Sequence, residues 1–183
     1  RWAKVVFSLP ERDRARSRLI AVMGDLMPGV EPTERADGVT VTWSSSDLAG
    51  LLFGNGLRGA AIDKTIPEWV LQLPETQRLS FVAGFVDGGG SGPSGCCGIS
   101  VNSANPSLLE GLAELLMTLG VTARIYPEFS EERIVEIRGY EATDRGSHRL
   151  EFAADPRLLR RVSSDFRDAV GRQSDPMLSD FRR

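Results

Sequence analysis

The residues of this chain that can do chemistry gather around an apolar stretch that ends in glycines. Residues 81–91 read Phe-Val-Ala-Gly-Phe-Val-Asp-Gly-Gly-Gly-Ser, so the carboxylate of Asp87 stands at the end of a helix-like run, and Lys64 lies upstream. Two carboxylates at adjoining helix ends can hold Mg²⁺ between an attacking water and a leaving oxygen, and a nearby lysine can stabilise charge on a phosphate. The stretch contains a single carboxylate, Asp87, so it does not offer a pair of this kind.

Three neighbouring stretches carry a family resemblance. They are Lys64-Thr65-Ile66-Pro67, the apolar run Phe81–Val86 with Asp87-Gly88-Gly89 behind it, and the segment 100–120. Taken together, residues 64–121 resemble the LAGLIDADG (DOD-type) homing endonucleases, intein-type or free-standing, in a degenerate or truncated form.

The resemblance implies recognition of double-stranded DNA and its Mg²⁺-dependent cleavage. It places Lys64 at the position of the catalytic lysine, Gly89 at the position of a metal-binding aspartate, and Asp87 at a helix junction, where it packs and caps. Because Gly89 has no carboxylate, we expect Mg²⁺ not to bind at full strength and cleavage to be impaired. The alternative is a non-cleaving nucleic-acid-binding module, a transcription regulator or maturase-like protein, on the same scaffold.

Local patterns predict the elements that position these residues. Apolar residues at helical spacing, strand-like runs and glycine or proline boundaries alternate along the chain. The first half is expected to contain strands at 1–9 and 39–43 and helices at 11–27 and 48–53. The second is expected to contain helices at 74–87, 105–120 and 157–166 and strands at 99–101, 122–129, 133–140 and 149–153.

This order of strand, helix, strands and helix occurs twice, which indicates two pseudo-symmetric halves of an α+β fold. The resemblance makes each half αββαββα with an antiparallel, saddle-shaped sheet. The helix at 74–87 precedes the second set, so we expect the first half to lack its matching signature helix. We therefore divide the chain into a partial first repeat (1–73), a second repeat (74–170) and a C-terminal tail (171–183).

The resemblance also implies that outward side chains of the sheets contact DNA in the major groove. Arginine suits this role because its planar fork matches guanine and phosphate. Glutamates such as Glu128 and Glu136 lie among these arginines, so a merely solvated sheet face remains the other interpretation. A further run, Arg12, Arg14, Arg16 and Arg18, is expected to form the wet side of a helix. The candidate DNA contacts are Arg124, Arg133, Arg138, Arg145 and Arg149 in the second half, with Lys4 and Arg35 in the first.

The bulk composition sets limits on the remaining classes. The chain of 183 residues is 41% hydrophobic and 26% charged, which is ordinary for a globular protein, and its net charge of -3 differs from the basic balance of many nucleic-acid-binding domains. Adjacent Cys96 and Cys97 with the single His148 argue against a structural zinc site. Neither a membrane-spanning run nor a signal peptide is apparent, so we expect a cytoplasmic, intracellular protein. The expected partners are double-stranded DNA and the remainder of a larger host polypeptide.

Overall fold

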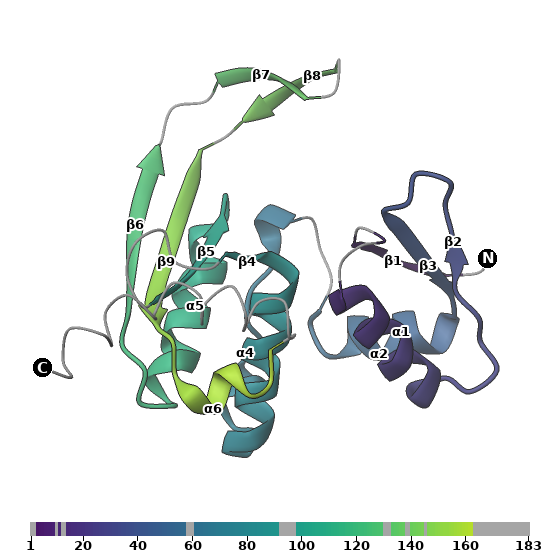
Figure 1. Cartoon of the computed structure of the whole chain (residues 1–183), viewed down its shortest axis with the longest axis horizontal. Helices are drawn as coiled ribbons and strands as arrows, with labels where there is room; N and C mark the ends of the chain where they lie inside the picture. Colours follow the sequence, from purple (N-terminus) through teal and green to yellow (C-terminus); the bar gives the residue numbers. More distant parts are fainter. Residues whose placement is uncertain are drawn as a thin grey trace, which may run out of the picture. The chain divides into compact units, whose positions relative to one another are not determined.

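The computed structural model describes residues 3–9, 11, 14–57, 61–91, 98–129, 133–137, 140–144 and 146–162. These residues fall into two compact units, residues 3–57 and residues 61–162 (Figure 1). Within the described ranges, no helix has the length and apolar composition that crossing a bilayer requires.

The first unit is a small antiparallel sheet backed by two helices. The strand order is β1-β3-β2, and the core on one side of the sheet contains Met23, Val41, Trp43 and Leu48. The Phe7 ring meets the Trp43 ring edge-on at a centroid distance of 5.7 Å. The elements are β1 (Lys4–Ser8), α1 (Arg14–Leu26), β2 (Thr33–Glu34), β3 (Thr40–Ser44) and α2 (Ser46–Gly54).

Arg16 corrects one of the expectations from sequence, because it is buried and not on a wet helix face. Its side chain is 4% exposed. Its Nη1 donates to the carbonyl oxygens of Leu9 (3.0 Å) and Gly38 (2.9 Å), and its Nη2 pairs with Glu34 at 2.8 Å. Residues two apart on a helix are rotated by about 200° around the helix axis and therefore lie on nearly opposite sides. Four arginines at alternate positions cannot share one face. Arg12 and the side chain of Arg14 lie outside the described residues, whereas Arg18 is exposed.

The second unit is a larger antiparallel sheet with its own helices. The order β5-β9-β6 repeats the β1-β3-β2 order of the first unit, with the last strand between the other two. Strand β4 extends one edge, and β7 and β8 form a separate hairpin that continues beyond β6 and β9 (Figure 1). The elements are η1 (Ala61–Asp63), α3 (Glu68–Leu71), α4 (Glu75–Gly89), β4 (Gly90–Ser91), β5 (Gly98–Ser103), α5 (Pro106–Met117), β6 (Ala123–Phe129), β7 (Arg133–Ile137), β8 (Tyr140–Asp144), β9 (Ser147–Ala153) and α6 (Pro156–Leu159).

Three of the differences from the expected elements lie in the second unit. Helix α4 continues through the first glycines to Gly89, and the N–H of Gly90 still donates to the carbonyl of Val86. The expected single strand 133–140 is divided, because β7 ends at Ile137 and β8 begins at Tyr140. The last helix is described only over Pro156–Leu159, and residues beyond 162 lie outside the described part.

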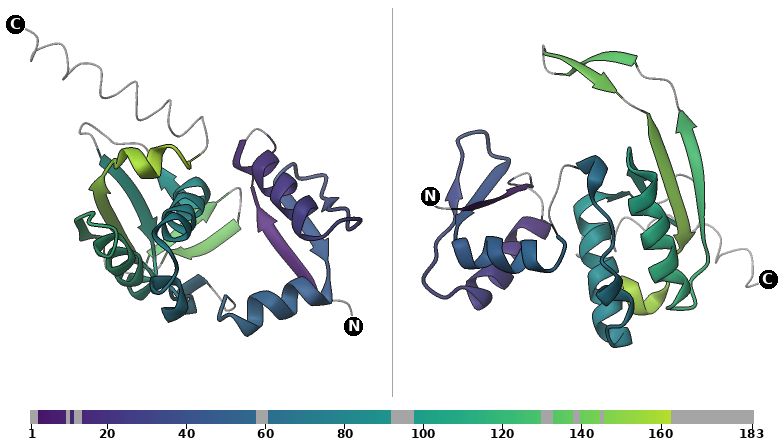
Figure 2. Two further views of the ribbon diagram at one scale, coloured as in Figure 1. Left: turned by 90° about the horizontal axis from the view of Figure 1, so that it is seen from below. Right: turned by 180° about the vertical axis from the view of Figure 1, so that it is seen from behind.

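Helices α4 and α5 pack on one face of the β5-β9-β6 sheet (Figures 1 and 2). Val82 and Val86 of α4, Leu112 and Leu116 of α5, and Leu150 of β9 all have 0% exposure in this core. Complete burial of such side chains contributes about 1.5–3 kcal/mol each. The core therefore fixes which face of the sheet points inward.

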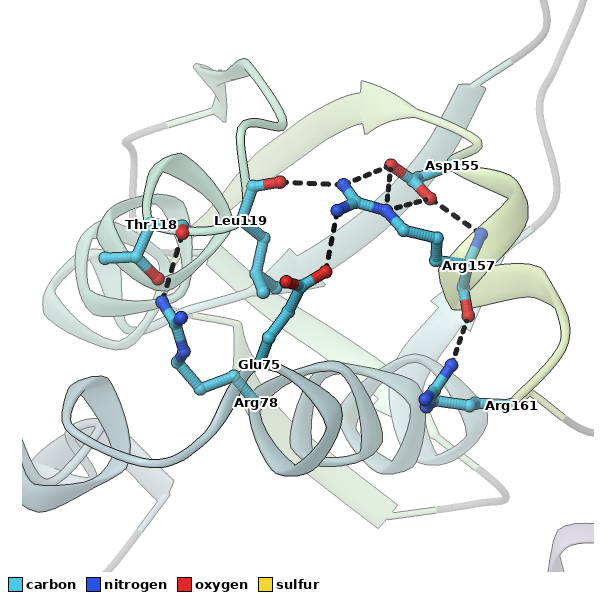
Figure 3. Close-up of polar contacts among 7 residues, drawn as sticks. All are labelled: Glu75, Arg78, Thr118, Leu119, Asp155, Arg157 and Arg161. Carbon is cyan, nitrogen blue, oxygen red and sulfur yellow. Dashed lines mark hydrogen bonds and ion pairs between the residues drawn. The ribbon is translucent and has the colours of Figure 1, made fainter.

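A polar network centred on Arg157 joins the ends of the three helices (Figure 3). Its guanidinium donates to Glu75 at the start of α4 (2.8 Å), to the carbonyl of Leu119 after α5 (2.8 Å) and to both oxygens of Asp155. The hydrogen bond from the Arg157 side chain is the largest cause that holds the pKa of Asp155 below its ordinary value. Arg78 of α4 adds a bond to the carbonyl of Thr118 at 3.0 Å.

This network predicts an acid-dependent loss of stability. The pKa of Asp155 is lowered in the folded state, so its stabilising contribution is complete above its unfolded value near pH 4 and is lost as the pH falls through the folded pKa. Asp155→Asn keeps an oxygen to cap α6 but removes the charge. We expect the variant to be less stable than the parent at pH 7 in urea unfolding, and the difference to shrink as the pH falls through the folded pKa of Asp155.

Asp63→Asn, which removes an exposed carboxylate from η1, is the control for the change in net charge. A stability difference between the parent and Asp155→Asn that stays constant from pH 7 to pH 2 would contradict the prediction.

Candidate nucleic-acid interface and the end of helix α4

The C-terminal residue of helix α4 is Gly89, which has no side chain. Gly89 is the last helical residue and is exposed, and a Cβ built on it meets no atom within 4 Å. Gly90 differs, because a Cβ there would lie 2.6 Å from the carbonyl oxygen of Val86. Asp87 is half-buried on the same helix and, being two residues away, points about 200° around the axis from position 89. Its carboxylate therefore does not substitute for one at position 89.

The residues described at this helix end do not fit the Mg²⁺ that the resemblance implies. Mg²⁺ is held through carboxylates and other oxygen ligands, and Gly89 provides no side-chain oxygen. Within the described part of the chain, no group of three or more His, Cys, Asp or Glu side chains is placed to hold a metal ion.

Lys64 is exposed, and the segment that carries it is fixed to helix α5. The buried Asn105, 3% exposed, donates from Nδ2 to the carbonyl of Lys64 at 2.6 Å. The Oδ1 of the same side chain accepts from the N–H of Leu108 at 3.2 Å and caps α5. A Cβ on Gly111 would lie 3.0 Å from the Ile66 side chain, so α5 and this segment approach closely. The sequence identified Asn105 only as a helix start; its link to a residue 41 positions away had no local signal.

The outward face of the β5-β9-β6 sheet brings two of the candidate arginines together. Leu150 and Phe152 point into the core, so Arg149 and Glu151, which alternate with them on β9, point outward. The register pairs Tyr126 with Arg149 and Arg124 with Glu151, which places both arginines on this face, opposite α4 and α5.

Carboxylates on this face pair with one of the two arginines. Arg149 forms ion pairs with Glu151 (3.1 Å, through Nε) and with Glu128 (3.5 Å, through Nη1). Arg124 is exposed and has no ion pair among the described residues. Two arginines and two glutamates leave these outward side chains with no net charge, so the face attracts phosphate weakly as a whole.

The first unit presents a different outward face. Residues that pair across β1, β2 and β3 on this side are mostly hydroxylated, such as Thr33 and Thr42. Lys4 pairs with Ser44 on this face, and the N–H of Arg35 donates to the carbonyl of Thr40 just beyond β2, continuing the same register. Both cations are exposed.

One carboxylate borders this hydroxyl-rich face. Asp37 accepts from the hydroxyl and N–H of Thr40 and from the N–H of Val39, and these bonds lower its pKa to about 2. It therefore stays ionised next to Arg35 at neutral pH.

The side chains of the remaining candidate DNA contacts lie outside the described residues. The backbone of Arg133 begins β7, while its side chain lies outside the described residues, as do Arg138 and Arg145 entirely. The roles of all these residues in binding stay predictions.

The bonds of Asn105 predict how the Lys64 segment responds to substitution. Asn105→Ala removes the cap of α5 and leaves the Lys64 carbonyl without its donor, so we expect the free energy of unfolding to fall by about 2–4 kcal/mol. Asn105→Ser keeps a capping oxygen but is too short to reach that carbonyl. The serine variant should recover about 1 kcal/mol in urea unfolding and still show faster amide hydrogen exchange around residues 64–66. Equal exchange in serine variant and parent would show that the carbonyl bond does not hold this segment.

Comparisons with known proteins agree with this architecture. Residues 76–162 match the family model described as the LAGLIDADG-like domain. Among curated proteins, an iron–sulfur cluster assembly SufBD family protein of Mycobacterium leprae is 29% identical over 125 residues, which cover 68% of this chain. The match spans only 14% of the length of that protein.

Solved structures share the fold at low sequence identity. Mesophilic variants of the homing endonuclease I-DmoI align with a TM-score of 0.58 at 16% identity, covering 87% of this chain and 79% of theirs. I-DmoI in complex with DNA and Mn gives 0.58 at 16% identity, with 88% and 81% covered. Full-length DUF199/WhiA from Thermotoga maritima gives 0.52 at 16% identity, with 98% and 54% covered. These likenesses establish the α+β LAGLIDADG-like fold, and with the family match they confirm the resemblance read from the sequence. The chain carries a LAGLIDADG-like domain at residues 76–162.

Proposed function

We propose that this chain is a homing-endonuclease-type domain that binds double-stranded DNA and is impaired in Mg²⁺-dependent cleavage. The observation that carries the proposal is the end of α4, where Gly89 is exposed and has open space around it. The resemblance assigns a metal-binding aspartate to this position. Two carboxylates are needed to hold a metal between attacking and leaving oxygens. Gly89 supplies no carboxylate at this helix end, and no group of three or more His, Cys, Asp or Glu side chains among the described residues is placed to hold a metal ion.

Binding of DNA is supported by the outward sheet faces and by the solved relatives. Each unit has a three-strand core of the same order, and each carries candidate cations on its outer side, Lys4 and Arg35 in one and Arg124 and Arg149 in the other. The I-DmoI structures with DNA show what a relative of this fold binds. On this proposal, the sheet faces contact DNA whether or not the chain cleaves it.

A non-cleaving nucleic-acid-binding module is the second candidate, and the room at Gly89 favours it. An added side chain would meet no neighbour there, so glycine is not kept at this position by crowding. In this second candidate function, the protein binds DNA but no part of it completes a metal site.

The size of the matched protein suggests a setting for the domain. The chain corresponds to a small part of a protein whose name refers to iron–sulfur cluster assembly. A DNA-binding domain within such a polypeptide is what an insertion, for example an intein, would produce. We propose a larger host polypeptide of this kind as the context of the chain.

The impaired site predicts the outcome of a plasmid-nicking assay with Mg²⁺. We expect no metal-dependent nicking by the unaltered chain. Gly89→Asp restores one carboxylate where space is open, so we expect it to bind Mg²⁺ more tightly than the unaltered chain does, with nicking limited by the lack of a second carboxylate. Gly88→Asp is the matched control, because it adds the same charge one residue earlier, also without a neighbour within 4 Å, but about 100° around the helix. A Mg²⁺-dependent rise in Tm of the DNA-bound protein serves as a second readout of metal binding.

Robust nicking by the unaltered chain would refute the impaired assignment. Equal behaviour of Gly89→Asp and Gly88→Asp in both readouts would show that residue 89 is not the metal position.

The proposed sheet contacts predict a salt-dependent affinity for duplex DNA. Arg124→Ala should weaken binding at low salt and reduce the slope of log K against log salt by about 1, because one phosphate neighbour is lost. Arg160→Ala removes the same charge from the exposed end of α6 and should leave the slope unchanged. Equal slopes for the two variants would contradict contact through the sheet face.

A further inference from the structure

A chain of polar contacts on the outward face of the second sheet holds Arg149 in one place. The hydroxyl of Ser147 donates to Oε2 of Glu128 at 2.9 Å, and Oε1 of Glu128 pairs with Nη1 of Arg149 at 3.5 Å. Glu151 pairs with Nε of Arg149 at 3.1 Å, and the guanidinium carbon lies 5.9 Å from the centre of the Tyr126 ring. The buried Nε–H of Arg149 has no hydrogen-bond acceptor among the described residues, so the two carboxylates and the aromatic ring restrict the guanidinium through charge and packing.

The constrained guanidinium still faces outward. The Arg149 side chain is 35% exposed, and its carboxylate partners are 30% and 43% exposed. Among the described residues, Nη2 of Arg149 has no ion-pair partner. The cluster therefore presents N–H donors and carboxylate acceptors side by side on the same open surface.

This arrangement suits a base edge better than a phosphate. Carboxylates next to the arginine repel phosphate and reduce sequence-independent attraction. In the major groove, guanine offers two acceptors, N7 and O6, and its paired cytosine offers the N4 amino donor. A held guanidinium flanked by carboxylates complements that pattern, and holding it in advance lowers the conformational cost of binding.

We propose that Arg149, with Glu128 and Glu151, reads a G·C base pair, the arginine donating to guanine and a flanking carboxylate accepting from cytosine. The assignment rests on the proposed DNA binding and adds the residues that give it sequence preference. Arg124 differs, since it lies on the same face without an ion pair among the described residues and supplies charge alone.

The test is selection from a randomised duplex DNA pool by the full chain at low salt, followed by sequencing of the bound fraction. The unaltered chain should enrich a guanine at one position of the bound sites. Arg149→Ala should reduce that preference about 5-fold to 150-fold, the range that one good bidentate contact provides. Arg124→Ala should lower the amount bound and leave the preference intact.

Two conservative variants separate base reading from charge and from folding. Arg149→Lys keeps the positive charge but lacks the planar fork, so it should retain affinity and lose the preference. Glu151→Gln removes a repelling charge, so it should bind the pool more tightly while its guanine preference falls severalfold. Urea unfolding of each variant identifies any that fail to fold, and the comparison of lysine with alanine at position 149 uses only folded protein.

The possible failures are distinguishable. If the unaltered chain binds no pool member at low salt, the proposed DNA binding is wrong, and the inference falls with it. If the chain binds but the preference of Arg149→Lys and Glu151→Gln equals that of the parent, DNA binding stands and the base-reading role of Arg149 is overturned.

Discussion

The second unit depends on the burial of one side of helix α4 against helix α5 and the sheet. Four residues of α4 are almost fully buried there: Leu79, Val82, Ala83 and Val86. Because Val86 lies in this core, the helix end that follows it is fixed relative to the sheet, and residue 89 with it. The same core takes up the inner side chains of β5, β9 and β6, which forces Arg124 and Arg149 to the other face. The position of residue 89 and the composition of the outer surface therefore have a common cause.

The parts of this arrangement that could be predicted from the sequence are those set by nearby residues. Asn105-Pro106 and the leucine stripe behind it predicted α5, and the glycine-interrupted apolar run predicted α4, since capping and helical periodicity act within a few residues. Alternation along β6 and β9 was enough to place Arg124 and Arg149 outward. The family resemblance, confirmed by the comparisons, rested on the same local stretches.

The parts that could not be predicted depend on contacts between residues distant in sequence. The sequence predicted a surface position for Arg16, whereas the fold surrounds its side chain with Leu9, Gly38 and Glu34. The Asn105 bond to Lys64 and the Glu75–Arg157 ion pair connect helices and loops whose meeting depends on the whole core. The glutamates near Arg149 were visible in the sequence, but whether they repel a ligand or hold the arginine depends on rotamers and on the bulge that shifts the register between Pro127 and Phe129.

The backbone at Gly89 has a consequence for how this domain changes over time. Gly89 is helical, is absent from the positions of positive φ, and borders open space, so the fold does not require glycine there as it does at Gly90. Glycine and aspartate codons can differ by a single base at the second codon position. The step between a helix end with a carboxylate and one without is therefore a point mutation that needs no accompanying repacking. Lineages carrying this domain can gain or lose the carboxylate at position 89 by such a mutation while the surrounding fold stays the same.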